Sequence, residues 1–417
     1  MSALNASNKK NKVLMVAYAC NPEGTGEHWL SWGWAERASA KFDVYLIANG
    51  NHRAAIERHA PRLSIQPFFV SLPAWYKNLT NRFGNLGSWL RQMAWQSKVA
   101  RLGRRLHDQH HFALVHQTTF HTFRIPFRLS ALGIPSVWGP IAGGEYVPGG
   151  FYGYLGSARL SETLRGLVNR PWLLFPPLRG SLRRASAIFV SNHCTLDFLP
   201  AWCHGKCLVV PPNALSDEQA RTSDVAPRPP GQPRAFHLLF VGYCAPTRAI
   251  PLVFEALRQS RLTDYRFFIV GDGPALDFWK REANRWGVAD KVEFVGRLPQ
   301  KQIDPYYRDA DVFVFPALRD SGGSGLLEAM SRGVPVVCLD WGGPGEMVDD
   351  TSGIKIPVTN PAETVQKFRQ ALELLHDDAP RRQSLAAAGW KRAHSMFVWD
   401  AKERILESTY GRLIESR

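Results

Sequence analysis

The stretch Asp320-Ser-Gly-Gly-Ser-Gly-Leu-Leu-Glu328-Ala-Met-Ser-Arg-Gly-Val-Pro-Val-Val337 decides the fold class of this chain. It places two carboxylates eight positions apart around a glycine pair that opens a helix. Gly333 is typical of a helix end, and the Val-rich run after it indicates a buried parallel strand. Because open α/β sheets bind ligands at such strand-to-helix crossovers, the stretch predicts a binding site in a parallel α/β fold.

The residue types in this stretch suit a nucleotide sugar. Ser321, Gly322 and Gly323 form the helix start, where backbone N–H groups and the positive end of the helix suit a diphosphate or sugar oxygens. Asp320 can accept hydrogen bonds from sugar hydroxyls. Glu328 lies two turns along the helix on nearly the same face, where it can bind a ribose. We therefore expect all five residues to contact a donor substrate.

Four more segments, in the same order along the chain, resemble the retaining glycosyltransferases of family four (group 1), which have the GT-B fold. They are Phe240–Arg248, Phe268–Pro274, Val292–Arg297 and Tyr307–Pro316. The resemblance covers residues from about 236 to 360. It implies two Rossmann-like domains whose parallel sheets face a central cleft, and a hexosyl transfer that needs neither a metal nor another cofactor.

The resemblance also assigns residues of the donor site. It implies that Arg248 and Asp320 are catalytic, with Arg248 forking onto the diphosphate. It also implies that the loops after three strands bind the donor through Gly242, Tyr243, Gly271, Gly296 and Arg297. Two positions depart from the family. Tyr243 stands where a basic residue is usual and cannot neutralise a diphosphate, and Asp320 replaces a Glu. These departures leave an alternative, a catalytically silent GT-B protein that binds a glycan or nucleotide as a scaffold.

The N-terminal half resembles the acceptor domain of the family. Its first predicted strand, 13–19, leads into a loop with Gly24 and Gly26, which the family places against the donor diphosphate. In the family a histidine after a later strand lies under the anomeric carbon. His116 and His121 are the two candidates in this chain, and the sequence leaves the choice between them open.

A glycine turn further along the same half is the predicted acceptor contact. Gly143, Gly144 and Glu145 follow a predicted strand and lie near the same cleft. Glu145 would bind an acceptor hydroxyl, or else it caps the following turn.

The hydrophobic runs alternate with helical patterns and indicate two α/β domains. We predict an N-terminal acceptor domain over 1–220, a linker over 221–235 that is rich in proline, and a C-terminal donor domain over 236–398. In the family the tail crosses back, so a helix over about 399–417 is expected to join the N-terminal domain.

Cysteines, acid pairs and apolar runs indicate neither a metal site nor a membrane span. Six cysteines form no disulfide framework. Cys203, His204 and Cys207 could be zinc ligands, but buried thiols and a surface turn are commoner. Asp309-Ala-Asp311 resembles a metal-binding string, yet it matches a structural position in the family. No run reaches the eighteen apolar residues of a span, so we expect a cytoplasmic protein.

Positive charge is concentrated in one region of the N-terminal half. The formal net charge is +15, and the segment 75–107 holds seven Lys or Arg residues and no acid among five aromatic side chains. Such a segment suits an anionic membrane surface, and an ordinary helix with a solvated basic face is the equal alternative. No nucleic-acid-binding pattern accompanies it. A membrane placement would bring the enzyme, peripheral at the inner face of the plasma membrane, to a polyprenyl-diphosphate-linked acceptor.

The function implied by the resemblance is transfer of a sugar from a nucleotide diphosphate sugar to a hydroxyl of a glycan or lipid-linked acceptor, with retained configuration. Assembly of a bacterial exopolysaccharide or lipopolysaccharide is the expected setting. A Rossmann oxidoreductase is the weaker reading, because Pro274 breaks the glycine spacing that a dinucleotide site requires.

Overall fold

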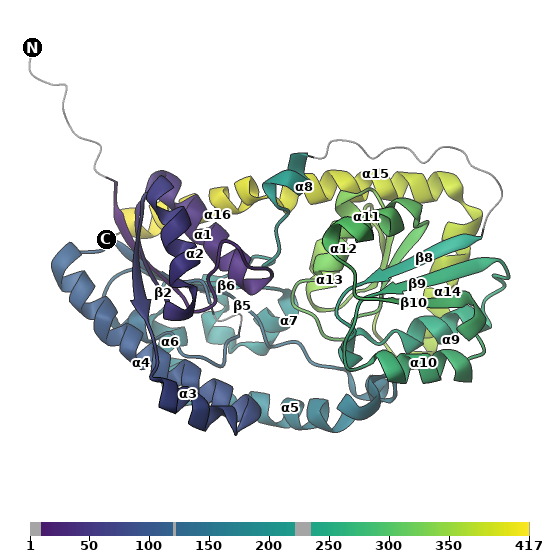
Figure 1. The fold of residues 1–417 in the computed structure, drawn as a ribbon, viewed down its shortest axis with the longest axis horizontal. Coiled ribbons are helices and arrows are strands. Elements are labelled where there is room, and N and C mark those ends of the chain that lie inside the picture. The colour runs from purple at the N-terminus through teal and green to yellow at the C-terminus, as the bar shows by residue number, and fades with distance from the viewer. Residues whose placement is uncertain (1–9, 120–121, 222–234, 417) are drawn as a thin grey trace, which may run out of the picture.

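The chain folds into two α/β lobes that lie side by side in the computed structural model (Figure 1). The structure describes residues 10–119, 122–221 and 235–416. The predicted linker, 221–235, falls almost entirely outside these residues, and so does His121.

The first lobe is built on a seven-stranded parallel sheet of order β3-β2-β1-β4-β5-β6-β7. Its strands are β1 (Lys12–Ala17), β2 (Asp43–Asn49), β3 (Ile65–Val70), β4 (Leu114–Gln117), β5 (Ser136–Ile141), β6 (Ala187–Val190) and β7 (Cys207–Val209). Its helices are α1 (Glu27–Lys41), α2 (Arg53–His59), α3 (Ala74–Asn81), α4 (Gly84–His110), α5 (Arg159–Trp172), α6 (Pro176–Arg184), α7 (His193–Phe198) and α8 (Asp217–Arg221).

The second lobe is built on a six-stranded parallel sheet of order β10-β9-β8-β11-β12-β13. Its strands are β8 (Phe236–Val241), β9 (Tyr265–Val270), β10 (Val292–Gly296), β11 (Val312–Phe315), β12 (Val336–Leu339) and β13 (Ile354–Ile356). The helices that follow are α9 (Pro251–Gln259), α10 (Leu276–Arg285), α11 (Gln300–Asp309), α12 (Ser324–Ser331), α13 (Gly342–Met347), α14 (Pro361–Asp377), α15 (Ala379–Met396) and α16 (Trp399–Glu415).

Both faces of the first sheet are covered, as strands made almost wholly of apolar residues require. Alternate residues of β1 contribute to two separate cores, with Leu14 and Val16 on one face and Val13 and Met15 on the other. The first core includes Trp95 of α4, which is fully buried. The prediction of an α/β fold with two parallel sheets is confirmed.

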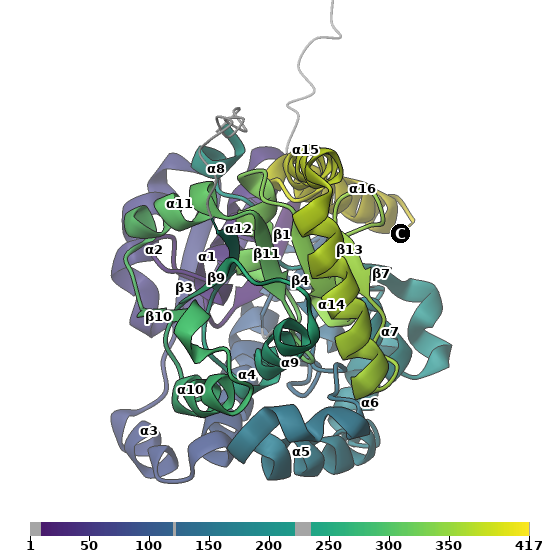
Figure 2. The same cartoon turned by 90° about the vertical axis from the view of Figure 1, so that its right-hand side faces the viewer.

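The chain crosses between the lobes in places that a simple division into halves would not show. A 3₁₀ segment, η4 (Gly149–Ala158), follows the middle of the first lobe, yet its Phe151 and Leu155 are buried in the core of the second lobe. α5 then returns to the first lobe. At the end of the chain α15 and α16 run along one side of both lobes, as the two views show (Figures 1 and 2).

The last helix, α16, packs on the first helix of the first lobe. Trp399, Leu406 and Tyr410 are buried in the core that α1 shares with the sheet. Gly33 on α1 leaves the space that the Trp399 ring fills, since a Cβ at Gly33 would lie 2.0 Å from Cζ2 of Trp399.

We expect Gly33→Ala to destabilise the protein, because the added methyl group forces the Trp399 ring or the whole of α16 to move. Overpacking of this kind costs about 1–3 kcal/mol. Gly411→Ala is the matched control, because a Cβ at Gly411 meets nothing within 4 Å. The control should leave stability unchanged or raise it by up to about 1 kcal/mol, the usual helix preference for Ala. Equal unfolding midpoints in urea for both variants would contradict the packing described for α16.

Candidate functional site between the lobes

The loops after the strands of both sheets meet where the lobes join. Parallel strands place all their carboxyl ends at one edge, which is where open α/β sheets bind ligands. Trp341, directly before α13 of the second lobe, donates its indole N–H to the Tyr146 carbonyl of the first lobe at 2.9 Å. Glu346 on α13 accepts hydrogen bonds from the backbone N–H and Nδ1 of His193 at 2.8 and 2.7 Å. The carboxyl edges of the two sheets therefore face each other.

The glycine-rich start of α12 is held by its own carboxylate. Oδ1 of Asp320 accepts from the backbone N–H groups of Gly322 and Gly323 at 2.7 and 2.9 Å. Gly323 has a φ of 69°, a left-handed conformation that favours glycine at this helix start. Ser321 lies half-buried in the same turn. The predicted anion-binding N–H groups thus exist, and Asp320 occupies two of them.

Asp320 also forms an ion pair with Arg248, and this pair joins two loops of the second lobe. The Arg248 guanidinium stacks 4.8 Å from the centre of the Phe315 ring. Burial, with Arg319 nearby, lowers the pKa of Arg248 to about 10, so the side chain stays charged at neutral pH. The structure therefore brings together Arg248 and Asp320, which are 72 positions apart in the sequence.

Glu328 lies half-buried further along α12. Its Oε2 accepts hydrogen bonds from Gln300 at 3.0 Å and from the Tyr307 hydroxyl at 3.3 Å. These contacts fix the carboxylate at the edge of the second lobe, on the same helix as the Asp320 turn.

The other predicted donor residues lie in neighbouring loops after β8, β9 and β10. Gly242 and Gly271 pack backbone to backbone, because a Cβ at Gly271 would lie only 1.9 Å from the Gly242 carbonyl oxygen. Gly296 has a φ of 83° at the end of β10. Tyr243 is 64% exposed and Arg297 is also exposed, so both side chains are free to meet a ligand from solvent.

In the first lobe, the predicted glycine loop after β1 leads directly into α1. Gly24 lies half-buried in this loop. Gly26 is the residue before α1 and has a φ of 58°, which suits glycine. The loop follows β1 at the carboxyl edge of the first sheet, the edge that faces the second lobe.

His116 lies in the core, which contradicts its prediction as a catalytic residue under the anomeric carbon. It has no exposed surface. Nε2 lies 2.8 Å from the Gly139 carbonyl, which only accepts hydrogen bonds, so Nε2 carries the proton. Nδ1 then accepts from the Tyr410 hydroxyl at 2.6 Å. The side chain of a residue within a strand points to one face of the sheet, and His116 points to the face that α16 covers.

Glu145 is also buried, at 3% exposure. Its carboxylate accepts from the Gly143 N–H at 2.9 Å, from Asn192 Nδ2 at 2.7 Å and from the Thr195 hydroxyl at 3.2 Å. Gly144 packs against α7, where a Cβ would lie 2.7 Å from Thr195 Cα. Of the two roles left open by the sequence, this geometry favours the cap of the turn over an acceptor contact.

A cluster of arginines beside Arg248 is not apparent from the motifs. Arg319 forms a two-pronged ion pair with Glu162 of α5, at 2.9 and 2.8 Å, across the junction of the lobes. Arg124 and Arg165 lie close enough to Arg319 to be affected by its charge. Burial first, and then that charge, lower the pKa of each. In the sequence their one signal is the stretch 163–196, which contains five arginines and no Asp or Glu. Together with Arg248, the cluster places four arginines near one another at the junction.

Asn213 is a second residue that no motif indicates. It is 7% exposed, and its side-chain amide lies against Gly322, where an added Cβ would be 2.8 Å from Nδ2. Nδ2 has no hydrogen-bond partner among the described residues. An amide donor is therefore available beside the helix start of α12.

The candidate metal ligands take structural roles. Asp311 caps the start of β8 by accepting from the His237 N–H at 2.8 Å. Cys203 and Cys207 donate to the backbone carbonyls of Pro200 and Cys203, at 3.0 and 3.2 Å. Within the described ranges no group of three His, Cys, Asp or Glu residues is placed to hold a metal ion.

Two Rossmann-like lobes whose parallel sheets meet at their carboxyl edges define the GT-B class of fold. The solved structure of the lipopolysaccharide outer core galactosyltransferase WaaB superposes with a TM-score of 0.64 at 13% identity, covering 95% of this chain and 99% of that one. The predicted GT-B fold is confirmed.

Residues 228–392 match the model of the family Glycosyl transferases group 1. A D-inositol 3-phosphate glycosyltransferase of Thermomonospora curvata is 33% identical over 45% of this chain and 46% of its own length. A GDP-mannose-dependent alpha-(1-6)-phosphatidylinositol monomannoside mannosyltransferase of Mycolicibacterium smegmatis is 28% identical over 58% of this chain and 67% of its own. The chain spans less than half the length of the first curated relatives that it matches.

The buried position of His116 has a consequence for stability. Burial lowers its pKa from 6.5 to about 4, so the unfolded chain takes up the proton first as the pH falls. Above pH 6.5 the titration of His116 should therefore leave the free energy of unfolding unchanged. Between pH 6.5 and 4 it should lower the free energy of unfolding by up to about 1.4 kcal/mol per pH unit. Urea unfolding at several pH values should show a steeper loss in the native protein than in His116→Gln.

His111→Asn is the control for this comparison, because His111 is exposed at the end of α4. If His116→Gln and the native protein lose stability in parallel on acidification, His116 does not titrate as a buried neutral side chain.

Proposed function

We propose that this protein is a glycosyltransferase that moves a sugar from a nucleotide diphosphate sugar to a hydroxyl of a glycan or lipid-linked acceptor, with retained configuration. The observation that carries the proposal is the ion pair between Arg248 and Asp320 at the start of α12. It lies at the carboxyl edge of the second sheet, in the part of the chain that matches the group 1 family model.

In this proposal the ion pair is exchanged when the donor binds. The diphosphate takes the place of Asp320 beside Arg248, because a phosphate accepts two parallel hydrogen bonds from a guanidinium. The N–H groups of Gly322 and Gly323 are released at the same time and face the anion at the positive end of the helix. Asp320 is then free to accept hydrogen bonds from the sugar hydroxyls.

The same groups would stabilise the leaving group. Departure of the nucleotide diphosphate builds negative charge while the anomeric centre becomes positive. Fixed positive charges at that point lower the barrier more in a buried site than in water. Arg248 would supply one charge and Arg319 would add to the positive potential. We propose that this suffices without a metal ion or other cofactor.

The setting of the reaction is proposed from the relatives. One of them is named for a phosphatidylinositol-based acceptor and for GDP-mannose, and a structural neighbour is a lipopolysaccharide galactosyltransferase. We infer a role in assembling a bacterial glycan, exopolysaccharide or lipopolysaccharide, on an acceptor such as a polyprenyl-diphosphate-linked chain. The work would take place on the cytoplasmic side, at the inner face of the plasma membrane. None of the described helices is long and apolar enough to cross a bilayer.

A catalytically silent scaffold that binds a glycan or nucleotide is the second candidate. The position where the family usually carries a basic residue holds Tyr243, which is exposed and makes no charge contribution. Such a protein would bind nucleotide sugars without cleaving them.

We expect Arg248→Ala to lower the rate of sugar transfer or of slow donor hydrolysis by about a hundredfold, as loss of one preorganised contact to a developing anion usually does. Arg258→Ala is the control, since Arg258 is exposed on α9 in the same lobe. A thermal-shift screen of UDP-, GDP- and ADP-sugars would first identify the donor, and release of the nucleotide diphosphate would then be measured.

Equal rates in the two variants would remove Arg248 from the proposed site. Donor binding without any nucleotide release in the native protein would favour the scaffold instead.

A further inference from the structure

Helix α5 has its polar face inside and its apolar face outside. Glu162 and Asn169 point inward and are buried, at 9% and 3% exposure. Glu162 pairs with Arg319, and Asn169 bonds to Arg124 and to the Gly143 carbonyl. The opposite face carries large apolar side chains that are 52–70% exposed, namely Leu160, Leu164, Leu167 and Val168. A helix on a protein surface normally shows the reverse pattern.

A second set of exposed apolar side chains lies at the turn between α3 and α4. Trp75, Leu79, Phe83 and Leu86 are 48–67% exposed. Helices α3 and α5 lie along the same edge of the molecule, at the bottom of both views (Figures 1 and 2). The two sets are joined beneath the surface, where the Trp89 and Trp172 rings meet edge to face at 5.4 Å.

We call this surface the docking edge, and it gathers most of the exposed apolar bulk of the described chain. It comprises Trp75, Leu79, Phe83, Leu86, Leu160, Leu164, Leu167, Val168 and Leu174. These are nine of the fifteen large apolar side chains that are exposed among the described residues. Exposed apolar side chains gathered along one edge in this way indicate a contact with another apolar body.

The charges around the docking edge are positive. The segment 74–107 contains no Asp or Glu, and the single acid in 159–186 is Glu162, which is buried on the inner face. Arg82, Arg159 and Arg170 are exposed beside the apolar side chains. Arginines around an apolar face suit an interface of lipid phosphates above acyl chains.

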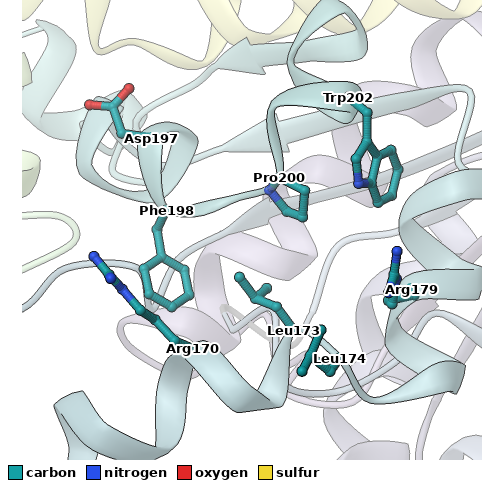
Figure 3. A pocket seen from close by; sticks show the side chains of 8 residues that line it. All are labelled: Arg170, Leu173, Leu174, Arg179, Asp197, Phe198, Pro200 and Trp202. Atoms are coloured by element: carbon teal, nitrogen blue, oxygen red, sulfur yellow. The ribbon is translucent and has the colours of Figure 1, made fainter.

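Two hollows lie on the outer side of α5 and its C-terminal turn. One, of about 420 Å³, is lined by Leu167, Val168, Pro171, Trp172, Leu174 and Phe175. The other, of about 440 Å³, has Arg170 and Arg179 on either side of Leu173 and Leu174, with Asp197 also in its lining, as Figure 3 shows. The first has the apolar lining that an acyl chain needs, and the second adds two cations and one carboxylate beside it.

We propose that the docking edge rests on an anionic bilayer, with the outer face of α5 in the interface. A second copy of the chain would have to bring two basic edges together, whereas a bilayer of anionic lipid complements both the charge and the apolar surface. Because the inner face of α5 holds Arg319 beside the Arg248–Asp320 pair, the helix would place the bilayer one helix thickness from the proposed site. The membrane contact is argued independently of the proposed function. Only the idea that the acceptor comes from the membrane rests on that function.

The docking edge does not include the arginines at the C-terminal end of α4, which are Arg101, Arg104 and Arg105. Arg101 lies fifteen residues beyond Leu86 on the same helix, roughly 22 Å along its axis. From the sequence, 75–107 is one candidate surface, but in the structure only its first part, up to Leu86, lies at the docking edge. The arginines at the far end of α4 should therefore matter less for binding than the leucines of α5.

The test compares two double variants of equal charge. Leu164→Glu with Leu167→Glu alters the docking edge, while Leu374→Glu with Met396→Glu alters exposed side chains of α14 and α15 in the other lobe. Sedimentation with vesicles of phosphatidylglycerol and phosphatidylcholine gives the partition coefficient at low and high salt. We expect the α5 variant to bind about a hundredfold more weakly, about tenfold per leucine, and the control to bind like the native protein.

Salt should weaken but not abolish binding of the native protein, because the apolar part of the contact is not screened. Three results would overturn the proposal: no sedimentation with anionic vesicles at low salt, equal binding of the two double variants, or concentration-dependent dimerisation, measured by light scattering, that the α5 variant alone loses.

Thermal shift with the identified nucleotide sugar, without vesicles, separates this proposal from the proposed function. If the native protein binds the donor but not the vesicles, the proposed function stands and the proposed membrane contact is wrong. If it binds vesicles but no nucleotide sugar, the membrane contact stands and the proposed function is wrong. In both cases the α5 variant should keep the unfolding temperature of the native protein, because the replaced side chains face solvent.

Discussion

The structure depends on one constraint, that the carboxyl edges of two parallel sheets must face each other. Neither lobe could fix this orientation alone, and the chain fixes it by exchanging parts. Phe151 and Leu155 leave the first lobe to complete the core of the second, and α16 returns from the second lobe to cover the first. The Tyr410 hydroxyl of α16 donates a hydrogen bond to His116, deep in the first sheet. This contact fixes α16 on the first sheet.

The same orientation concentrates charge at the junction. Arg248 and Asp320 neutralise each other within the second lobe, while Arg319 reaches across to Glu162. Burial first, and then the nearby charge of Arg319, lower the pKa of Arg248 to about 10. The charges of this cluster are paired without a ligand, and in the proposed exchange a diphosphate takes the place of one carboxylate, that of Asp320. That property suits a site that must bind a diphosphate and release it again.

Helix α5 links this junction to the outside of the molecule. Its inner residues take part in the charge cluster, and its outer residues form half of the docking edge. The two faces of this helix therefore suit two different environments, a polar one at the site and an apolar one at the surface. In a protein surrounded only by water, exposure of the outer face forgoes about 25 cal/mol of burial free energy per Å² of apolar area.

The sequence by itself determined the two parallel sheets and the loops that carry Arg248, Asp320 and Glu328. These follow from local patterns, namely apolar runs, glycine turns and their spacing, which act within a few residues. The match of residues 228–392 to the group 1 model likewise needs no structure. Only the tertiary structure decided what each side chain touches. His116 matches a motif but faces the side of its strand that α16 buries, and Arg319 matches none but lies beside Glu162 through folding alone. The physical reason is that burial and pairing depend on segments distant in the chain, which local spacing does not encode.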